Sequence, residues 1–229
     1  MEIIGRLRKK KVAEHYNRIS KYYDGFGFGF LKRLFEFRLY VEILKYLGPG
    51  DAVLDVACGT GNMSFELTTK FKRVYGIDIS KGMLKQAKLK IRRGKVEKRK
   101  IEFIYGDGEY LPFKDKSFDA VTCMLAISHF SDAERAISEM KRVLKDGGIL
   151  VFNLLEMKDS ILKKIFWKRL QSLRRRLSTN LDSEKLLRIL SDAKKYKRND
   201  IIGPFFRFAF NNFVFVYQKQ RGEKHGVFV

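Results

Sequence analysis

The stretch Asp55-Val-Ala-Cys-Gly59-Thr-Gly61-Asn62 decides the fold, because an apolar run changes there into a helical pattern. The preceding run, Ala52–Ala57, is short and apolar, as in a strand buried on both faces. From Met63 to Phe71, apolar residues recur at helical spacing. The two glycines let the backbone approach a ligand closely, and the amides at the start of the helix are free to bind an anionic group. The stretch therefore predicts a strand–turn–helix unit with a ligand at the turn.

Downstream of this unit, strand and helix patterns alternate. A helix capped by Ser80 is predicted to run from about Lys81 into the basic stretch Lys88–Lys100, and another covers Ala133–Leu144 and stops at Asp146-Gly147-Gly148. Four further strands are predicted: Arg73–Asp78, Ile101–Tyr105, Asp119–Leu125 and Ile149–Leu155. Strands that alternate with helices at this spacing along the chain indicate βαβ units and a mostly parallel sheet.

The flanking segments complete one predicted domain over residues 1–229. Residues 1–48 are expected to form an N-terminal helical cap, broken in two at Gly25-Phe-Gly-Phe-Gly29, and residues 51–155 form the ligand-binding core. Residues 156–200, which include Trp167 and Arg174–Arg176, are expected to form a helical, basic lid or insertion. Residues 201–229 are expected to supply closing strands, with Phe205–Lys219 forming an antiparallel pair around Asn211-Asn212.

Composition bears on partners more than on the fold. The chain has 48 Lys and Arg against 26 Asp and Glu, which gives a formal net charge of +22. Such a charge attracts nucleic acid, a phospholipid surface or an acidic substrate. A surface rich in charged residues is also typical of proteins adapted to high temperature, so charge alone leaves both interpretations open.

Cysteine usage and hydropathy favour a cytoplasmic location. Cys58 and Cys123 are too few for a disulfide framework and lack a zinc-binding spacing, so no metal site is expected. With no base apparent beside either thiol, both are interpreted as small apolar side chains of the core. No apolar stretch follows the basic N-terminus, so we expect no signal peptide, and no run approaches the roughly 18 apolar residues of a membrane span.

Two more acids follow predicted strands. Asp78 ends the second strand, where an acid about 20 residues after a glycine turn binds ribose hydroxyls, and Asp107 follows the third strand in Gly106-Asp-Gly-Glu109. Together with Asp55, these carboxylates stand at the carboxyl ends of adjacent strands, where open α/β sheets bind ligands. One such acid is commonly a loop or cap residue, but three with the glycines favour a nucleotide-type site.

Comparison with known glycine motifs narrows the class of ligand that this site could bind. No third glycine stands at the spacing of dinucleotide-binding enzymes, and no Gly-Lys-Ser/Thr follows as in a P-loop. Instead the chain resembles class I S-adenosylmethionine-dependent methyltransferases, in particular the ubiquinone/menaquinone C-methyltransferase branch. The segments that carry the resemblance are Val53–Gly61, Val74–Ser80, Gly106–Phe113 with Ser117–Asp119, Glu139–Gly148 and, upstream, Tyr16–Asp24.

The resemblance covers about residues 15–155. It implies a Rossmann-like α/β fold: a seven-stranded, mostly parallel sheet with an antiparallel last strand, helices on both faces and an N-terminal helical cap. It also implies S-adenosyl-L-methionine as the cofactor and a small-molecule methyl acceptor. After residue 155 no acceptor-specific motif is found.

The same resemblance implies roles for individual residues. Gly59 and Gly61 would lie against the methionine part of the cofactor, and Asp55 would receive its ammonium group, directly or through water. Asp78 would hold the ribose, Asp107 the adenine amino group, and Tyr23 would close over the cofactor. Three further contacts are implied: Ala57, Ile79 and Gly108, the last of which stands where the family usually has alanine.

The acceptor side offers one candidate for catalysis. Methyl transfer mainly requires alignment of donor and acceptor, and a base is needed only where the acceptor must lose a proton. His129, in Ala126-Ile-Ser-His-Phe130 after the fourth strand, is the histidine placed where the acceptor should lie. A packed or capping histidine is the alternative interpretation.

Three functions remain open at this stage. The leading hypothesis is a methyltransferase acting on a lipophilic quinone-like or aromatic molecule, with the basic surface in peripheral contact with anionic membrane lipids. The second is a tRNA or rRNA methyltransferase that uses the basic surface, although no Asn/Asp-Pro-Pro-Tyr-type motif follows the fourth strand. The third is a non-catalytic cofactor-binding protein, against which the three intact acids argue.

Overall fold

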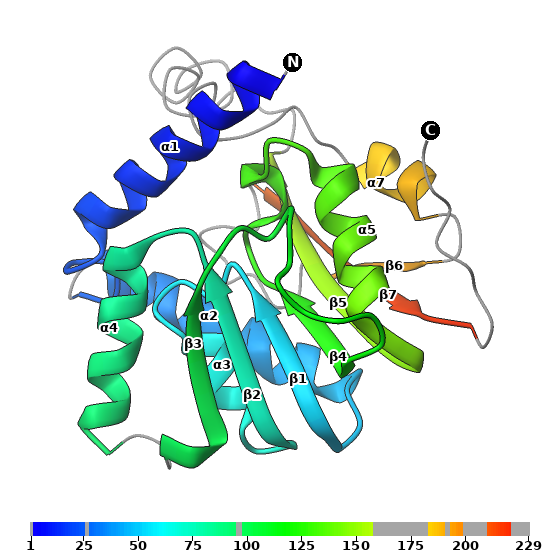
Figure 1. Ribbon diagram of the computed structural model, residues 1–229, viewed down its shortest axis with the longest axis horizontal. Coiled ribbons are helices and arrows are strands. Elements are labelled where there is room, and N and C mark those ends of the chain that lie inside the picture. The colour runs from blue at the N-terminus through cyan, green and yellow to red at the C-terminus, as the bar shows by residue number, and fades with distance from the viewer. Residues whose placement is uncertain are drawn as a thin grey trace.

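Seven strands form a single sheet in the computed structural model, which describes residues 2–25, 28–94, 98–157, 183–190, 193–198 and 210–220 (Figure 1). The strands are β1 (Gly50–Val56), β2 (Phe71–Asp78), β3 (Ile101–Tyr105), β4 (Phe118–Cys123), β5 (Leu144–Met157), β6 (Lys194–Lys197) and β7 (Phe210–Gln218). Their order across the sheet is β3-β2-β1-β4-β5-β7-β6. Strands β1 to β5 pair in parallel, whereas β7 runs antiparallel to both β5 and β6. The predicted mostly parallel sheet with an antiparallel last strand is confirmed.

Helices cover both faces of this sheet. They are α1 (Glu2–Ile19), α2 (Phe28–Lys45), α3 (Asn62–Leu67), α4 (Lys81–Arg92), α5 (Ala133–Val143) and α7 (Ser183–Ile189), with the short 3-10 helices η1 (Lys98–Lys100) and η2 (Ile127–His129). In Figure 1, α2 and α3 lie behind the sheet, α5 lies in front of it, and α1 passes over the carboxyl ends of the strands. None of the helices in the described residues has a stretch long and apolar enough to cross a membrane.

The order of the strands reverses between β1 and β4. β1 pairs with β2 on one side and with β4 on the other, so the chain crosses back over the sheet at this point. Loops on the two sides of such a reversal diverge and leave a crevice at the carboxyl ends of the strands. The ligand site is therefore expected between the loops that follow β1, β2 and β4.

Burial follows the patterns in the sequence. Residues Ala52–Val56 of β1 are all buried, as expected for a central strand with helices on both faces. In α5 the buried positions recur at helical spacing: Ala133, Ala136, Ile137, Met140 and Val143. Ser80 caps α4 as predicted, because its hydroxyl accepts a hydrogen bond from the Met83 amide at 3.2 Å.

The C-terminal part of the sheet differs from the prediction. Asn211 and Asn212 are not the turn of a hairpin; they lie inside β7, opposite Glu156 and Leu155 of β5. The Asn212 side chain is buried and its Oδ1 accepts a hydrogen bond from Nδ2 of Asn153 at 2.9 Å, so this asparagine pairs with a polar partner across the sheet.

The helical prediction for residues 156–200 is wrong at both ends of that range. Residues 156 and 157 continue β5, and residues 194–197 form β6, the second partner of β7. The helical part within the described residues is α7. The predictions for Trp167, for Arg174–Arg176 and for the middle of the lid fall outside the described residues.

Candidate active site

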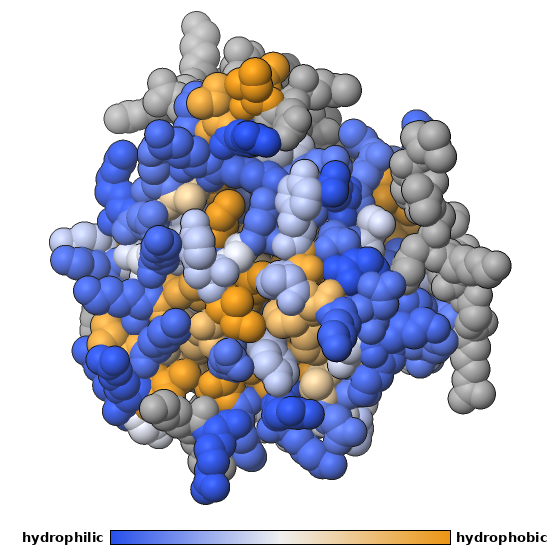
Figure 2. All heavy atoms as spheres, viewed as in Figure 1, coloured by the Kyte–Doolittle hydropathy of each residue, from blue (hydrophilic) through white to orange (hydrophobic). Residues whose placement is uncertain are grey.

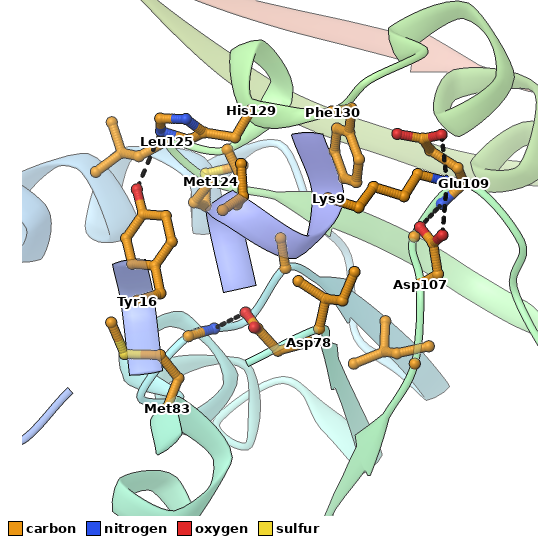
Figure 3. Close-up of a pocket in the computed structure, with 18 of the residues that line it drawn as sticks. Lys9, Tyr16, Asp78, Met83, Asp107, Glu109, Met124, Leu125, His129 and Phe130 are labelled. Carbon is orange, nitrogen blue, oxygen red and sulfur yellow. Dashed lines mark hydrogen bonds and ion pairs between the residues drawn. The ribbon is translucent and has the colours of Figure 1, made fainter. Parts of the chain in front are cut away.

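The main cavity lies at the carboxyl ends of β1, β2 and β4, beneath α1 (Figure 3). Its space, including the part open to solvent at its mouth, is about 740 Å³. Eight of the ten residues predicted for the site line it: Tyr23, Ala57, Gly59, Asp78, Ile79, Asp107, Gly108 and His129. Asp55 and Gly61 do not. The fold thus brings residues from five separate segments of the chain to one cavity.

Asp78 holds the glycine turn in place. Its Oδ2 accepts a hydrogen bond from the Gly59 amide at 2.8 Å, and its Oδ1 accepts one from the Ser80 amide at 2.7 Å. Burial raises the pKa of Asp78, and these two amide hydrogen bonds oppose that shift. Because a carboxylate has about four lone-pair positions, acceptor capacity remains for a hydroxyl-bearing ligand in the cavity.

The two glycines of the turn have different structural roles. Gly59 has a φ of +57°, and a Cβ built on it would meet no atom within 4 Å, so its bare face borders open space. Gly61 has a φ of +81°, and a Cβ there would lie 2.5 Å from Cζ of Phe103 on β3. Gly61 begins α3 and allows this helix to pack closely against the sheet.

Asp55 faces a smaller cavity behind the turn. This cavity of about 360 Å³ shares with the main one the residues Tyr23, Ala57, Gly59, Met124 and Leu125, so the two spaces adjoin. The Asp55 carboxyl is fully buried and accepts hydrogen bonds from Ser64 Oγ at 2.5 Å and from Thr122 Oγ1 at 3.0 Å. Burial raises the pKa of Asp55 to about 7; the two hydroxyls oppose the shift and the charge of Asp78 adds to it.

A polar cluster fixes the segment before α2 against this smaller cavity. Lys90 of α4 forms an ion pair with Asp24 at 2.7 Å and donates to Asn62 Oδ1 at 2.6 Å. The amide of Asn62 donates in turn to Asp24 at 3.0 Å and to Glu36 at 3.3 Å. Through Asp24, the cluster holds neighbouring Tyr23 at the point where the two cavities join.

The acid after β3 is paired with a lysine from α1. Lys9 Nζ lies 2.7 Å from Asp107 Oδ2 and 2.6 Å from Glu109 Oε2, and all three side chains line the main cavity (Figure 3). Burial lowers the pKa of Lys9, but the hydrogen bonds and charges of the two carboxylates outweigh burial and raise it. The ion pairs hold α1 over the mouth of the site.

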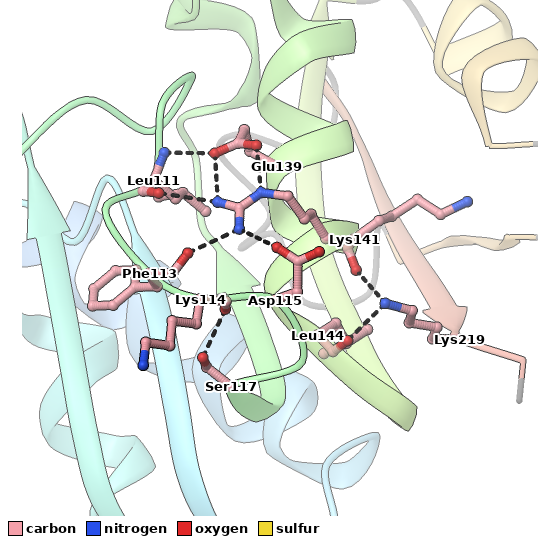
Figure 4. A network of polar contacts seen from close by, with 10 residues as sticks. Leu111, Phe113, Lys114, Asp115, Ser117, Glu139, Lys141, Leu144 and Lys219 are labelled. Atoms are coloured by element: carbon pink, nitrogen blue, oxygen red, sulfur yellow. Dashed lines mark hydrogen bonds and ion pairs between the residues drawn. The ribbon is translucent and has the colours of Figure 1, made fainter. Parts of the chain in front are cut away.

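The loop that carries Asp107 and Glu109 is anchored to α5. Arg142 donates to both carboxylate oxygens of Glu139, and its other hydrogen bonds reach the loop itself (Figure 4). The loop partners of Arg142 are the carbonyls of Leu111 and Phe113 and the carboxylate of Asp115. Glu109 also accepts hydrogen bonds from the amides of Ser131 and Asp132, just before α5. These bonds hold the acids in position by contacts outside the cavity.

His129 lies at the opposite side of the cavity from Asp107 (Figure 3). Its Nε2 lies 3.1 Å from the hydroxyl of Tyr16 on α1, and the two rings meet edge to face. Burial raises the pKa of Tyr16 to about 12, and the charge of Asp78 adds to the shift. The phenol therefore stays protonated at neutral pH and restrains the imidazole ring by hydrogen bonding.

Sequence reasoning missed several residues that line the cavities. Lys9 and Tyr16 belong to α1 and lie 98 and 113 residues from their partners Asp107 and His129. Glu36 comes from α2 and lines the smaller cavity, and Glu109 stands two residues after the predicted site residue Asp107. The sequence signal for Glu109 was its place in Gly106-Asp-Gly-Glu109, whereas nothing in the local pattern distinguishes Lys9 from the other cations of α1.

Comparison with known proteins agrees with this geometry. Residues 54–152 match the family model described as methyltransferase domain. The chain is 32% identical over 187 residues to an uncharacterised protein of Methanocaldococcus jannaschii, covering 78% of this chain and 68% of that protein. It is 35% identical over 157 residues to the demethylmenaquinone methyltransferase of Thermotoga maritima, covering 65% of this chain and 63% of the relative.

Solved structures share the fold. A phosphoethanolamine N-methyltransferase 2 from Haemonchus contortus, in complex with S-adenosyl-L-methionine, superimposes with a TM-score of 0.68 at 16% identity. The match covers 89% of this chain and 60% of that one.

The chain belongs to the class I S-adenosylmethionine-dependent methyltransferases, and the ubiquinone/menaquinone C-methyltransferases are among its relatives. It is an enzyme that uses S-adenosyl-L-methionine as the methyl donor. The cavity suits this molecule, because the bare face of Gly59 borders it and the carboxylates of Asp78, Asp107 and Glu109 line it. These carboxylates favour a cationic sulfonium although the chain as a whole has a positive net charge.

Proposed function

We propose that this methyltransferase acts on a small, lipophilic acceptor with a quinone-like or aromatic ring. The observation that carries the proposal is the side of the cavity opposite Asp107, where His129 and Tyr16 stand beside Met83, Met124 and Leu125. An apolar surface with one hydrogen-bonded imidazole suits a flat, greasy ring that must lose a proton. The demethylmenaquinone methyltransferases among the relatives support the same acceptor class.

In this proposal the cofactor lies across both cavities. Asp78 binds the ribose hydroxyls, and Asp107 with Gly108 binds the adenine. Gly59, Ala57 and Ile79 line the path of the cofactor, and Tyr23 closes over it. Asp55 acts on the ammonium group from the smaller cavity, directly or through water, since its two oxygens each accept one hydroxyl hydrogen bond and keep further acceptor capacity. Gly61 supports the site by seating α3.

The cofactor supplies an activated methyl group, and the protein supplies alignment and exclusion of water. α1 covers the cavity through Lys9, so a bound acceptor is enclosed between this helix and the loop after β4. Positioning of this kind can lower a barrier by roughly 7–11 kcal/mol. His129 accepts the proton that a ring carbon or hydroxyl of the acceptor loses, and Tyr16 holds the imidazole in place.

The experiment is an acceptor assay with methyl-labelled cofactor. The purified protein is incubated with demethylated naphthoquinols and benzoquinols, with catechols, and with a structureless RNA as the alternative acceptor. Label should appear in a lipophilic ring compound and not in RNA. Transfer to RNA alone, or binding of the cofactor with no transfer to any ring compound, would contradict the proposal.

The same proposal includes contact with a membrane surface. At its N-terminal end, α1 exposes Ile3, Ile4 and Leu7 next to the cations Arg6 and Lys10. Figure 2 shows hydrophobic surface at the top of the molecule, where this end of the helix lies in Figure 1. An apolar patch bordered by cations is typical of segments that lie on anionic lipid.

The enzyme should float with anionic liposomes at low salt, and the double substitution Ile4→Asp with Leu7→Asp should abolish flotation. Unchanged flotation of this double variant would exclude α1 as the contact.

A further inference from the structure

A second large cavity lies at the other end of the parallel sheet. It is a groove of about 1,190 Å³, measured to its open mouth, between the end of α4 and the starts of β2 and β3. It shares no lining residue with the cofactor cavity. β2 contributes Arg73, Val74 and Tyr75 to the groove and its last two residues, Ile77 and Asp78, to the cofactor cavity. The groove is therefore separate from the methyl-transfer chemistry.

Five cations line this groove and are exposed to solvent: Arg73, Lys88, Arg92, Arg99 and Lys100. The acid that lines it is Glu102, and the structure shows no ion pair to any of the five within the described residues. The floor is apolar, formed in part by Val74, Ile101 and Phe103. The basic stretch that the sequence displays between residues 88 and 100 thus becomes the walls of a cavity.

The arrangement of these cations is unfavourable for the isolated protein. Lys88 and Arg92 are four residues apart on α4, so they share one helix face at about 5–6 Å. Val74 of β2 lies opposite Ile101 of β3 in the sheet. Arg73 and Lys100 directly precede these two residues, so their backbones are about 5 Å apart, the distance between neighbouring strands. Like charges at such spacings destabilise the fold.

Thermal adaptation does not account for this pattern, because it favours networks of opposite charges. Elsewhere on the described surface some exposed cations do have carboxylate partners: Lys72 pairs with Asp51, and Lys116 with Asp146, both at 2.8 Å. A cluster of like charges around a groove is instead the arrangement that an anionic ligand would relieve.

We infer that the groove binds the phosphodiester backbone of a single-stranded RNA segment. A bilayer surface is too flat to enter a groove, whereas a single strand can follow it with phosphates against the cationic walls. The apolar floor accepts the sugar and base faces that a bare inorganic anion lacks. The contact is to the backbone, so it carries little sequence preference.

The test measures binding of a fluorescein-labelled, structureless RNA dodecamer by anisotropy across a range of KCl concentrations. If all five cations contact phosphates, the slope of log K against log salt should be about −3.5. The variant Lys88→Ala/Arg92→Ala/Lys100→Ala should bind at least 10-fold more weakly at low salt, and its slope should fall to about −1.4.

A matched variant controls for net charge. Lys114→Ala/Arg188→Ala/Lys194→Ala also removes two lysines and one arginine from exposed positions, all outside the groove. It should change RNA affinity by less than about threefold. The groove variant should melt at or above the wild-type temperature, because it removes cations that repel one another, and the control variant should melt close to it. Both variants should keep methyl transfer, so loss of RNA binding is measured independently of the enzyme's activity.

Three outcomes would overturn the inference. The first is an equal loss of RNA affinity in both triple variants, which would indicate diffuse attraction by net charge. The second is displacement of the RNA by inorganic polyphosphate of the same charge at equal concentration, which would mean that the floor contributes nothing. The third is groove-dependent binding of anionic vesicles in place of RNA.

Discussion

At the scale of single residues, His129 carries the clearest prediction. His129→Ala should lower kcat by about 10²–10⁴-fold and leave cofactor affinity within threefold, because the imidazole acts on the acceptor. Tyr16→Phe should show a smaller loss of kcat, since it removes the restraint on the ring and keeps the base. The measurements are steady-state kinetics and calorimetry with S-adenosylhomocysteine. Unchanged turnover of His129→Ala would remove this residue from the mechanism.

Asp55 should make folding stability depend on pH. Its pKa is raised to about 7 in the folded state from 3.8, so the folded protein binds a proton more tightly than the unfolded chain. The stabilisation from this proton is complete below about pH 4 and is lost as the pH rises through about 7. Relative to Asp55→Asn, wild type should therefore lose unfolding free energy between these values. Urea unfolding of both proteins across this range measures the difference, and parallel curves would contradict the assignment.

The two glycines of the turn should respond differently to alanine. Gly59→Ala places a side chain in open space at positive φ, which costs about 1–2 kcal/mol of stability and obstructs the cofactor. Gly61→Ala adds a clash with Phe103, so its total loss should reach about 2–4 kcal/mol. Denaturation and cofactor titration of the pair separate the two effects. Equal stability losses would show that the packing of α3 does not depend on Gly61.

At the scale of elements, α1 acts as the cover of the site. Its contacts to the loop after β3 pass through Lys9, which pairs with Asp107 and Glu109 at one end of the cavity. Its contact to the loop after β4 passes through Tyr16. Gly5 and Asn17 add hydrogen bonds from α1 to Ser131 and to the start of α4, so the cover is held along its length and opens by releasing some of these contacts.

Lys9→Met should loosen this cover. The variant keeps the length of the side chain and loses both ion pairs, so cofactor dissociation should become about 10-fold faster and amide exchange in α1 should increase. Lys10→Met is the matched control, because Lys10 is exposed on the same helix. Stopped-flow fluorescence and hydrogen exchange test the prediction, and equal dissociation rates in the two variants would refute it.

At the scale of the whole molecule, the net charge of +22 predicts how stability responds to salt. Repulsion among the excess cations opposes the compact state, and salt screens it. Between 0.05 and 0.5 M KCl the unfolding free energy should rise by about 1 kcal/mol, which raises Tm by about 2–4 °C. A Tm that falls with salt would show instead that surface ion pairs dominate. Scanning calorimetry makes the measurement.

The sequence by itself determined the parallel core and most of the predicted residues that line the cavity. Short segments of sequence specify each strand and helix of the core, through apolar runs, a glycine turn and helical spacing. Because the strands are parallel, Asp78 and Asp107 at their carboxyl ends lie at one edge of the sheet. Only the tertiary structure decided what faces these acids. Lys9 and Tyr16 reach the cavity from α1, and β7 inserts between β5 and β6 in place of a terminal hairpin. The contacts of Lys9 and Tyr16 join residues about a hundred positions apart. Like the position of β7, they depend on how whole elements pack, which short-range periodicity does not encode.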